Sequence, residues 1–362
     1  MYPFFRSLLF RLDPEQAHAL TLAALRVTGA LPPLNWTIEQ IYKTPDQPVE
    51  AFGLIFKNPV GLAAGYDKDG VAIRGLAALG FGHIEIGTVT PRPQPGNPKP
   101  RIFRLLKDDA VINRMGFPSR GAEFVQNKLN PSLRAGLIER IIGIQPRNKK
   151  RNVKSINKGG IILGVNLGKN KDTPNEEAVF DYLALLENFA PYADYLTVNV
   201  SSPNTAGLRQ LQRRDALESL LTQLHAQRQL EEKKLEKKLP LLVKLAPDLA
   251  ASELDDAIDV IIRTRMDGVI AVNTTLAREG LRLSYQNESG GLSGSPLRAR
   301  SEAVLHQIVK RVNNKIPIVS AGGILNPDDA KRRLDNGAAL VQIYTGLIYR
   351  GPGFVKEIMR AL

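Results

Sequence analysis

One short segment carries side chains well suited to chemistry: the motif NVSSPN at residues 199–204. Its hydroxyl and amide groups follow residues 195–200, a β-branched and apolar run typical of a strand buried on both faces. The proline ends any helix or strand ladder at this point. The active and binding sites of α/β proteins lie at the carboxyl ends of buried parallel strands. The same residue types, however, also form ordinary turns. The elements around the motif must therefore decide between the two interpretations.

Eight apolar segments of strand length recur along the chain, and stretches of helical or loop character separate most of them. The expected strands are residues 60–64, 83–87, 161–167, 195–200, 241–245, 268–273, 316–320 and 340–344, and the clearest helices are residues 176–188, 216–238, 251–263, 299–313 and 327–336. Buried strands that alternate with helices predict an α/β fold with a parallel sheet, and eight such units predict a closed (β/α)₈ TIM barrel. An open, doubly wound sheet is the alternative. Neither a G-x-G-x-x-G motif after an early strand nor a Walker sequence is present, which argues against dinucleotide and P-loop folds.

Three regions interrupt the alternation within the barrel, which we place at residues 46–362. Residues 51–57 alternate like one strand that closes the barrel floor. Residues 102–106 and 110–113 predict a hairpin inserted after the second strand. Residues 130–160 are long and basic, and they predict a surface insertion before the third strand.

Residues 1–45 form a separate N-terminal region that predicts a pair of short amphipathic helices. Asp13 has the character of an N-cap, followed by Pro14 and Glu15 in the first turn. Because such helices are too small to bury their own apolar faces, they either pack on the barrel or lie in a membrane interface. Both locations are compatible if the helices form an apolar entrance to the barrel.

The composition narrows the chemistry further. The chain of 362 residues contains no cysteine, which excludes disulfides, thiolate nucleophiles and cysteine-ligated iron–sulfur or zinc sites. Its four histidines are scattered without metal-ligand spacing, so we expect no metal site. No apolar run has the length of a membrane span, and we expect no signal peptide.

The net charge of +13 is compatible with nucleic acid, anionic lipid or an anionic small substrate as a partner. Part of the excess charge gathers at residues 147–158, in a stretch poor in apolar residues. No nucleic-acid-binding motif and no interleaved aromatic residues accompany this cluster. It is therefore interpreted as a solvated loop or a lipid-headgroup contact, with nucleic acid as the third alternative.

Two lysines and several glycines stand at the expected strand ends. Lys68 follows the first strand, close to Gly65, and Lys244 lies within the fifth strand, where an unpaired charge would be costly. We therefore expect Lys244 to face an anion or an anionic ring. The glycine-rich turns at residues 321–323 and 344–346 fit the phosphate site common to such barrels. A phosphate clamp, a lysine and several amides suit flavin mononucleotide (FMN), although a barrel isomerase or aldolase could share the clamp.

Several motifs in one order resemble the dihydroorotate dehydrogenases, specifically their quinone-dependent class 2 group. The resemblance covers nearly the whole chain. It rests on LDPEQAH at 12–18, KNPVGLAAGYDK at 57–68, EIGTVTPRPQPG at 85–96, NRMGF at 113–117, NVSSPNT at 199–205 and GGLSG at 290–294. Each motif alone is weak, and their joint order is highly specific.

The resemblance implies a reaction and a base. Dihydroorotate would lose a proton from C5 to Ser202 and a hydride from C6 to flavin N5, which gives orotate for de novo pyrimidine (UMP) synthesis. Because a serine hydroxyl is a poor base at neutral pH, its proton needs a route away; Thr205 and a water near Phe117 are the candidates. Class 1 relatives use a cysteine, which this chain lacks.

The resemblance also implies three sets of binding residues. The FMN positions are Ala64, Gly65, Tyr66, Asp67, Lys68, Thr88, Asn166, Asn199, Lys244, Val272, Gly294, Gly323, Tyr344 and Thr345. The substrate positions are Lys68, Asn113, Arg114, Met115, Gly116, Phe117, Asn199, Asn204, Asn273 and Thr274. The quinone positions are His18, Arg104 and Tyr344. Val272 and Tyr66 depart from the family pattern, since relatives usually carry threonine and an apolar residue there.

From these implications we expect one FMN per chain, a quinone as electron acceptor and a monomer that does not bind nucleic acid. The N-terminal helices would attach it peripherally to the anionic surface of the cell inner membrane, on the cytoplasmic side. Two rival interpretations stay open: a flavin- or phosphate-binding barrel with another substrate, and a basic binding protein without catalysis.

Overall fold

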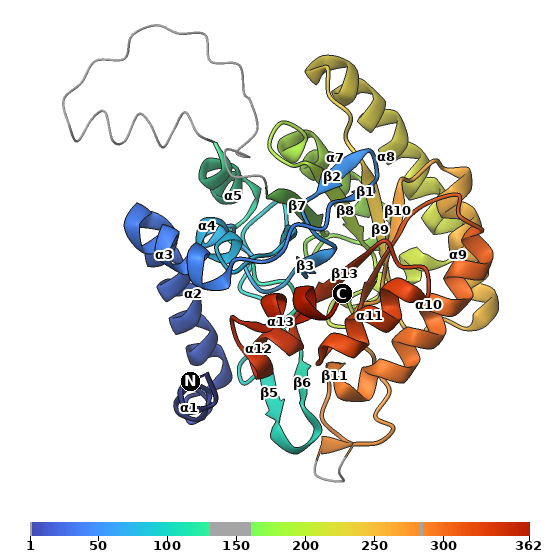
Figure 1. Ribbon diagram of the computed structural model, residues 1–362. Helices are drawn as coiled ribbons and strands as arrows, with labels where there is room; N and C mark the ends of the chain where they lie inside the picture. Colours follow the sequence, from blue (N-terminus) through green and yellow to red (C-terminus); the bar gives the residue numbers. More distant parts are fainter. Residues whose placement is uncertain (1, 131–160, 282–284) are drawn as a thin grey trace, which may run out of the picture.

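The computed structural model describes residues 2–130, 161–281 and 285–362, and at its centre is a closed barrel of parallel strands (Figure 1). The barrel strands are β3 (Val60–Leu62), β4 (His83–Val89), β7 (Ile162–Leu167), β8 (Tyr195–Asn199), β9 (Leu241–Leu245), β10 (Gly268–Ala271), β12 (Ile318–Ala321) and β13 (Leu340–Ile343). They follow one another around the barrel in chain order, and β13 pairs with β3 to close it. The predicted TIM barrel is therefore confirmed.

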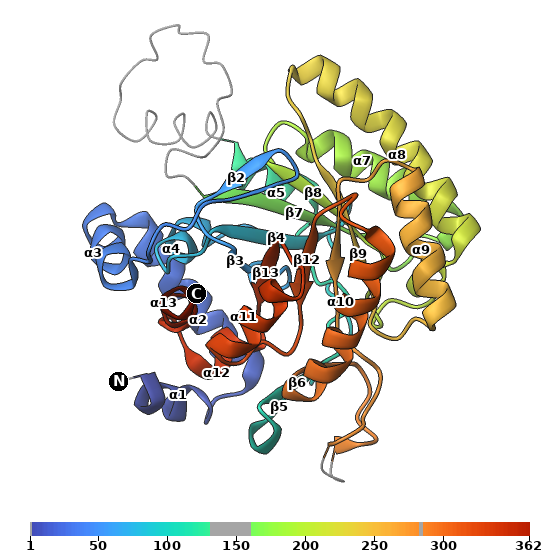
Figure 2. The ribbon, with the colours of Figure 1, turned by 45° about the vertical axis from the view of Figure 1, so that its right-hand side comes forward.

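Helices surround the barrel on its outside (Figure 2). Those of the barrel region are α4 (Ile73–Ala77), α5 (Ala122–Leu129), α7 (Ala178–Phe189), α8 (Arg214–Leu235), α9 (Ala251–Arg263), α10 (Arg298–Val312), α11 (Pro327–Asp335), α12 (Thr345–Arg350) and α13 (Phe354–Ala361). In α9 the buried residues Leu254, Ala257, Ile258 and Ile261 recur at helical spacing, which directs one face onto the barrel. Every residue of β4, β8 and β9 is buried, because helices cover one face of each strand and side chains fill the barrel interior.

The N-terminal region contains three helices and not the expected pair: α1 (Tyr2–Leu9), α2 (Pro14–Ala30) and α3 (Pro32–Tyr42). Asp13 caps α2 as predicted, because its Oδ1 accepts hydrogen bonds from the backbone N–H groups of Glu15 and Gln16 at 2.9 and 3.1 Å. Leu31 has extended backbone and separates α2 from α3, which then begins with a proline in its first turn. This second helix start was not predicted, because the consecutive prolines Pro32 and Pro33 also fit a loop.

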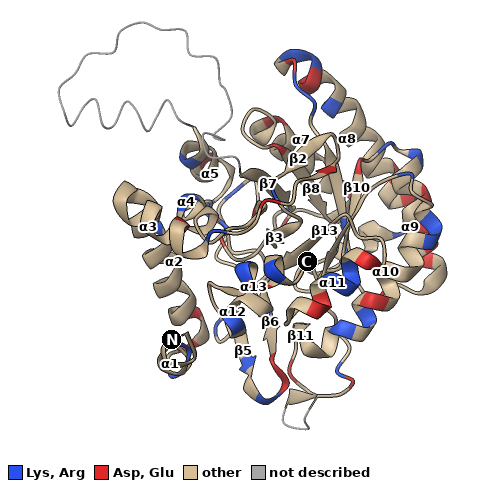
Figure 3. Cartoon of the chain, in the orientation of Figure 1, with Lys and Arg blue, Asp and Glu red and all other residues tan. Residues whose placement is uncertain are grey.

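These helices rest on the barrel region without forming a core of their own. Ala17 is the buried residue of the three helices within the described part of the chain. The carboxylate of Glu15 binds the guanidinium of Arg101 through two hydrogen bonds of 2.6 and 3.2 Å, and the Tyr2 hydroxyl donates to the Ile348 carbonyl at 2.6 Å. Figure 3 shows that α2 and α3 carry few charges, in contrast to α8, α9 and α10. Within the described ranges, no helix is both long and apolar enough to cross a membrane.

The barrel floor is covered by a hairpin and not by the single strand expected at 51–57. Strands β1 (Val49–Ala51) and β2 (Leu54–Phe56) pair antiparallel. Between them, Phe52 and Gly53 have φ values of 55° and 73°, as a tight two-residue turn requires. Because phenylalanine is uncommon in such a turn, the apolar residue Phe52 gives the segment the sequence pattern of one continuous strand.

The predicted hairpin after the second barrel strand is confirmed as β5 (Ile102–Leu105) and β6 (Ala110–Asn113). A third strand, β11 (Gly291–Gly294), pairs antiparallel with β6 and was not predicted. Its sequence is GLSG, which has none of the β-branched residues that signal a strand. From residue 131 on, the expected basic insertion lies outside the described residues.

Candidate functional site

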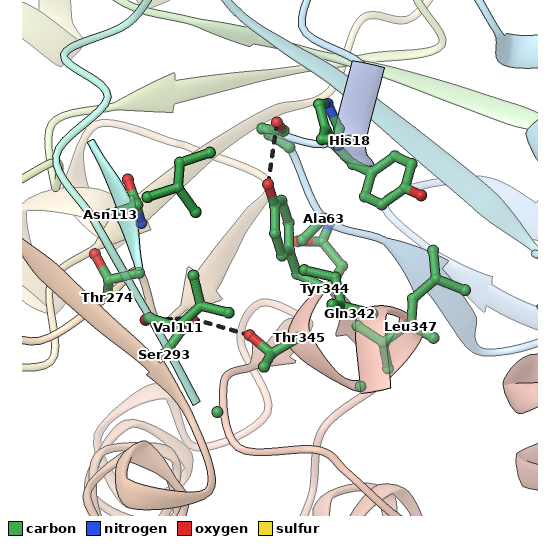
Figure 4. A pocket seen from close by; sticks show the side chains of 18 of the residues that line it. His18, Ala63, Val111, Asn113, Thr274, Ser293, Gln342, Tyr344, Thr345 and Leu347 are labelled. Atoms are coloured by element: carbon green, nitrogen blue, oxygen red, sulfur yellow. Dashed lines mark hydrogen bonds between the residues drawn. The ribbon is translucent and has the colours of Figure 1, made fainter. Parts of the chain in front are cut away.

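A cavity of about 610 Å³ lies at the carboxyl ends of the barrel strands. It is bounded by the strand ends, by the sheet β5–β6–β11 and by helices α1 and α2. Figure 4 shows side chains from these elements pointing into it, among them Asn113, Thr274 and Tyr344. The size falls within the usual range for small-molecule sites, about 300–1,000 Å³.

The motif at 199–204 lines this cavity and is held by its own hydrogen bonds. Asn199 ends β8; its Nδ2 donates to Thr88 Oγ1 at 3.0 Å and to Asn166 Oδ1 at 2.9 Å. Its Oδ1 accepts from the Ser201 hydroxyl at 2.9 Å, and Asn273 Nδ2 donates to that hydroxyl at 2.9 Å. The amides of three strand ends are thereby fixed in direction, so the motif is not an ordinary solvated turn.

Ser202 lines the cavity next to a second amide pair. Its Oγ accepts a hydrogen bond from the backbone N–H of Asn204 at 3.2 Å. Asn204 Nδ2 donates to Asn113 Oδ1 at 3.2 Å, which links the motif to the end of β6. Thr205 is buried, and its Oγ1 has no hydrogen-bond partner among the described residues.

Lys68 brings a positive charge to the loop after β3. Its Nζ donates to the Gly65 carbonyl at 2.8 Å, and the side chain lines the cavity. Burial lowers the pKa of Lys68 to about 8. The neighbouring Asp67 turns away from the cavity: its carboxylate accepts from the backbone N–H groups of Val71 and Ala72 at 2.9 and 2.7 Å and so holds the loop.

Lys244 lies opposite a carboxylate of the same chain within the barrel. Its Nζ lies 3.9 Å from Oε1 of Glu85, and both side chains are buried. Burial lowers the pKa of Lys244, and the carboxylate of Glu85 opposes this shift. Glu85 also accepts hydrogen bonds of 2.8–3.2 Å from uncharged donors: Asn166, Tyr195, Thr197 and Gln342. Sequence reasoning missed Glu85, although an acidic residue inside an apolar strand was a usable signal.

The glycine turn after β12 brings main chain to the cavity wall. Gly322 and Gly323 have φ values of 95° and 76°, where glycine is strongly favoured. A Cβ on Gly323 would lie 2.4 Å from the Cα of Arg298, so no larger residue fits. The neighbouring wall contains Thr345, whose hydroxyl donates to Ser293 Oγ at 2.9 Å (Figure 4).

Apolar and aromatic residues of the N-terminal region line the other part of the cavity, among them Tyr2, Phe5, Leu9, Phe10, Ala17 and Leu25. The His18 ring packs edge-on to Tyr66 at 5.0 Å, and Tyr66 packs on Tyr344 at 5.8 Å. Burial lowers the pKa of His18 to about 4, which keeps the ring neutral at physiological pH. The Arg104 guanidinium lies 4.7 Å from the Phe10 ring centroid and donates to the Leu9 carbonyl at 3.1 Å.

Most of the predicted site residues meet in this one cavity. Those that line it are His18, Ala64, Gly65, Tyr66, Lys68, Thr88, Arg104, Asn113, Met115, Gly116, Phe117, Asn199, Ser202, Asn204, Lys244, Val272, Asn273, Thr274, Gly294, Gly323, Tyr344 and Thr345. Four others, Asp67, Asn166, Thr205 and Arg114, are not part of its wall. Asn166 lies one layer deeper and bridges Glu85 to Asn199. Arg114 pairs instead with Glu288 and donates to Ser289 Oγ at 3.0 Å.

The sequence and the fold are similar to those of known proteins. Residues 48–362 match the family described as Dihydroorotate dehydrogenase. The chain is 45% identical over 362 residues to the Dihydroorotate dehydrogenase (quinone) of Halorhodospira halophila, an alignment that covers 100% of this chain and 97% of that protein. It is 46% identical over 363 residues to the protein of that name from Cronobacter sakazakii, covering 100% and 99%.

Among solved structures, the ligand-free DHODH of Eimeria tenella superposes with a TM-score of 0.80 at 40% identity and covers 96% of this chain and 94% of that chain. The complex of Eimeria tenella DHODH with ferulenol gives a TM-score of 0.79 at 38% identity, with coverages of 96% and 90%. The alignments with the two relatives from Halorhodospira halophila and Cronobacter sakazakii cover the whole chain and so include the N-terminal helices. The chain therefore belongs to the dihydroorotate dehydrogenase family.

Proposed function

We propose that this chain oxidises dihydroorotate to orotate with one bound FMN and passes the electrons to a membrane quinone, as a step of pyrimidine synthesis. One observation carries the proposal: a single cavity joins the amide-lined barrel mouth to the apolar N-terminal helices. A small substrate rich in carbonyl and imide groups suits the first part, and a long-tailed quinone suits the second. The relatives' name, Dihydroorotate dehydrogenase (quinone), supports both the substrate proposed for the amide-lined part and the quinone proposed for the apolar part.

FMN fits the residues present. The turn Gly322–Gly323 brings main-chain groups to the cavity wall, where they are available to a phosphate, and a Cβ on Gly323 would clash with Arg298 behind the turn. Lys244 supplies a positive charge at the floor of the same cavity, and Thr345 supplies a hydroxyl. When bound, FMN supplies the hydride-accepting chemistry that protein side chains lack.

The substrate would lie against the amides of Asn113, Asn199, Asn204 and Asn273, which can donate to ring carbonyls and accept from ring N–H groups. Hydrogen bonds hold these amides in place before substrate arrives, directly between Asn204 and Asn113 and through the Ser201 hydroxyl between Asn273 and Asn199, which lowers the cost of ordering them. The ammonium group of Lys68 suits the substrate carboxylate. Burial that lowers its pKa also makes a bound carboxylate more favourable, because the two charges would neutralise each other.

Ser202 is the proposed base for the C5 proton. Its Oγ already accepts the Asn204 N–H, which helps to stabilise negative charge on that oxygen. The proton needs an exit because a serine hydroxyl is a weak base. The unpartnered Oγ1 of the buried Thr205 supports a short relay from Ser202 through a water.

Peripheral attachment to the cytoplasmic side of the inner membrane is proposed from the surface of the N-terminal helices. Large apolar side chains there are 47–67% exposed: Phe4, Phe5, Leu8, Leu20, Val27, Leu31, Trp36 and Ile41. Interfacial helices expose such residues to the acyl boundary. Since Phe5 also lines the cavity, the same surface would lead a quinone from the bilayer inward.

An anaerobic visible spectrum before and after addition of dihydroorotate tests the proposal. We expect a flavin band that bleaches with the substrate and returns when a quinone is added. A band that persists would indicate a flavin barrel with another substrate. A purified chain that holds no flavin and cannot be reloaded with FMN would refute the enzymatic proposal.

A further inference from the structure

Arg333 of helix α11 is a fully buried arginine that lies behind the glycine turn. The two N–H bonds of its Nη2 are shared among three acceptors: the carbonyl oxygens of Gly322 and Arg298, both at 3.1 Å, and the hydroxyl oxygen of Ser301 at 2.6 Å. Ser301 in turn donates to the Gly322 carbonyl at 2.8 Å, so the carbonyl is held from two sides.

The next peptide of the turn is held in a similar way. Arg298 Nε lies 3.4 Å from the Gly323 carbonyl oxygen, to which it donates. In a trans peptide the N–H points away from the C=O of the same unit. The two carbonyls point to arginines, so the N–H groups of Gly323 and Ile324 point the other way. Both residues line the cavity, so those N–H groups are directed toward it.

Arg333 also places a positive charge beside the turn, where the carboxylates of Glu302 and of the buried Asp329 oppose the cost of burying that charge. Its closest carboxylate oxygen belongs to the partly exposed Glu302 and lies 3.5 Å from Nε, an atom for which the described residues provide no hydrogen bond. Burial lowers the pKa of Arg333 to about 10, so the guanidinium remains charged at neutral pH. A charge of this kind favours an anion in front of the turn.

We propose that Arg333 is a positioning residue for the phosphate of the cofactor. Its guanidinium holds the carbonyls of the glycine turn on the side away from the cavity and thereby aims the turn's N–H groups at the phosphate. The inference rests on the proposed use of FMN and adds the device that shapes its phosphate site. A purely structural arginine would instead affect the whole fold and every flavin equally.

The test compares FMN with riboflavin, which differs from it only by the phosphate. Dissociation constants of both are measured by flavin fluorescence on the full-length chain, for the parent and for Arg333→Met. We expect the FMN constant to rise about 10- to 100-fold, as for loss of a hydrogen bond from a charged group. The riboflavin constant should change by less than about threefold, because riboflavin has no phosphate for the turn to hold.

Lys331→Met is the matched control, since Lys331 lies two residues before Arg333 in α11, is about half exposed and pairs with Asp335 at 3.4 Å, away from the clamp. It removes one positive charge without touching the turn, and both constants should stay within about threefold of the parent. Ser301→Ala tests the same clamp with little change of volume, and it decides the question if Arg333→Met does not fold. It should weaken FMN selectively, by about threefold to tenfold.

Equal weakening of FMN and riboflavin, or unchanged FMN binding, in these variants would overturn the role of Arg333. A parent chain that binds neither flavin would instead refute the proposed function itself.

Discussion

Replacing Lys244 by methionine is expected to lower the free energy of unfolding by about 4 kcal/mol. The figure follows from the 3.9 Å between Lys244 Nζ and Glu85 Oε1. Two unit charges at that separation attract by about 4 kcal/mol at an effective dielectric constant of about 20. Without the lysine, the Glu85 carboxylate keeps only uncharged donors, and a buried charge that loses its partner typically costs about 3–5 kcal/mol.

The double variant Glu85→Gln with Lys244→Met provides the decisive comparison. It has no buried charge at this position, so its free energy of unfolding should return to within about 1 kcal/mol of the parent. The assay is urea unfolding of the flavin-free, full-length chain, followed by circular dichroism. Flavin must be absent because its binding would add to the free energy of unfolding, and the variants would change that added amount.

The pairing would be refuted if the change in the free energy of unfolding of the double variant equalled the sum of the changes in the two single variants. The pH dependence gives a second check. In Glu85→Gln, burial continues to lower the pKa of Lys244 without the opposing carboxylate, so its folded pKa lies further below the unfolded value of about 10.4. The unfolded state then binds more protons between these two values, and the free energy of unfolding rises with pH across that window. The double variant should not show this rise.

Further predictions concern the proposed site and the N-terminal region. Ser202→Ala should keep FMN bound but slow flavin reduction by about 10²–10⁴, measured by anaerobic stopped flow, and near-normal reduction would exclude its role as base. Because burial lowers the pKa of Lys68 to about 8, kcat/KM for dihydroorotate should fall above that pH. Lys68→Met should lower kcat/KM and abolish that decline, and an alkaline limb that persists would assign it to another group. Removal of residues 1–45 should spare flavin reduction and impair reoxidation by a long-tailed quinone; unchanged quinone turnover would make these helices structural only. Asp13→Ala should cost about 1 kcal/mol in thermal or urea unfolding, through loss of the cap on α2, and unchanged stability would contradict that cap.

The barrel was predictable because its signals are local. Each strand is a short apolar run, and each major helix has one apolar face. The Asp13 cap is also a local signal, because Asp13 and the first turn of α2 are adjacent in the sequence. The polar strand ends could also be assigned to one site, since parallel strands of a barrel bring their carboxyl ends together. Asn199 and Asn273 meet for this reason, although they come from distant parts of the sequence, whereas Asn113 reaches the same cavity from the end of the hairpin strand β6.

What escaped prediction depends on partners far away in the chain. Arg333 lies in the run KRRLD, which has the pattern of an exposed helix face, and only the packing of α11 behind the glycine turn buries it. Glu85 was similarly ambiguous until Lys244 was placed opposite. Strand β11 takes its conformation from β6 and not from its own residue preferences.

Closure of the barrel by β13 and β3 also has a consequence for biosynthesis. The pair joins Val341 to Val60, so a growing chain exposes the unpaired edge of β3 until nearly all of the barrel has been translated. Pairing between such distant segments is intrinsically slow, and open strand edges promote aggregation. Strand β12 and the start of α12 supply the glycine turn and Thr345, which come equally late from the ribosome. The proposed cofactor site is therefore completed only in the last stage of folding, and the exposed edge of β3 is where interrupted chains would aggregate.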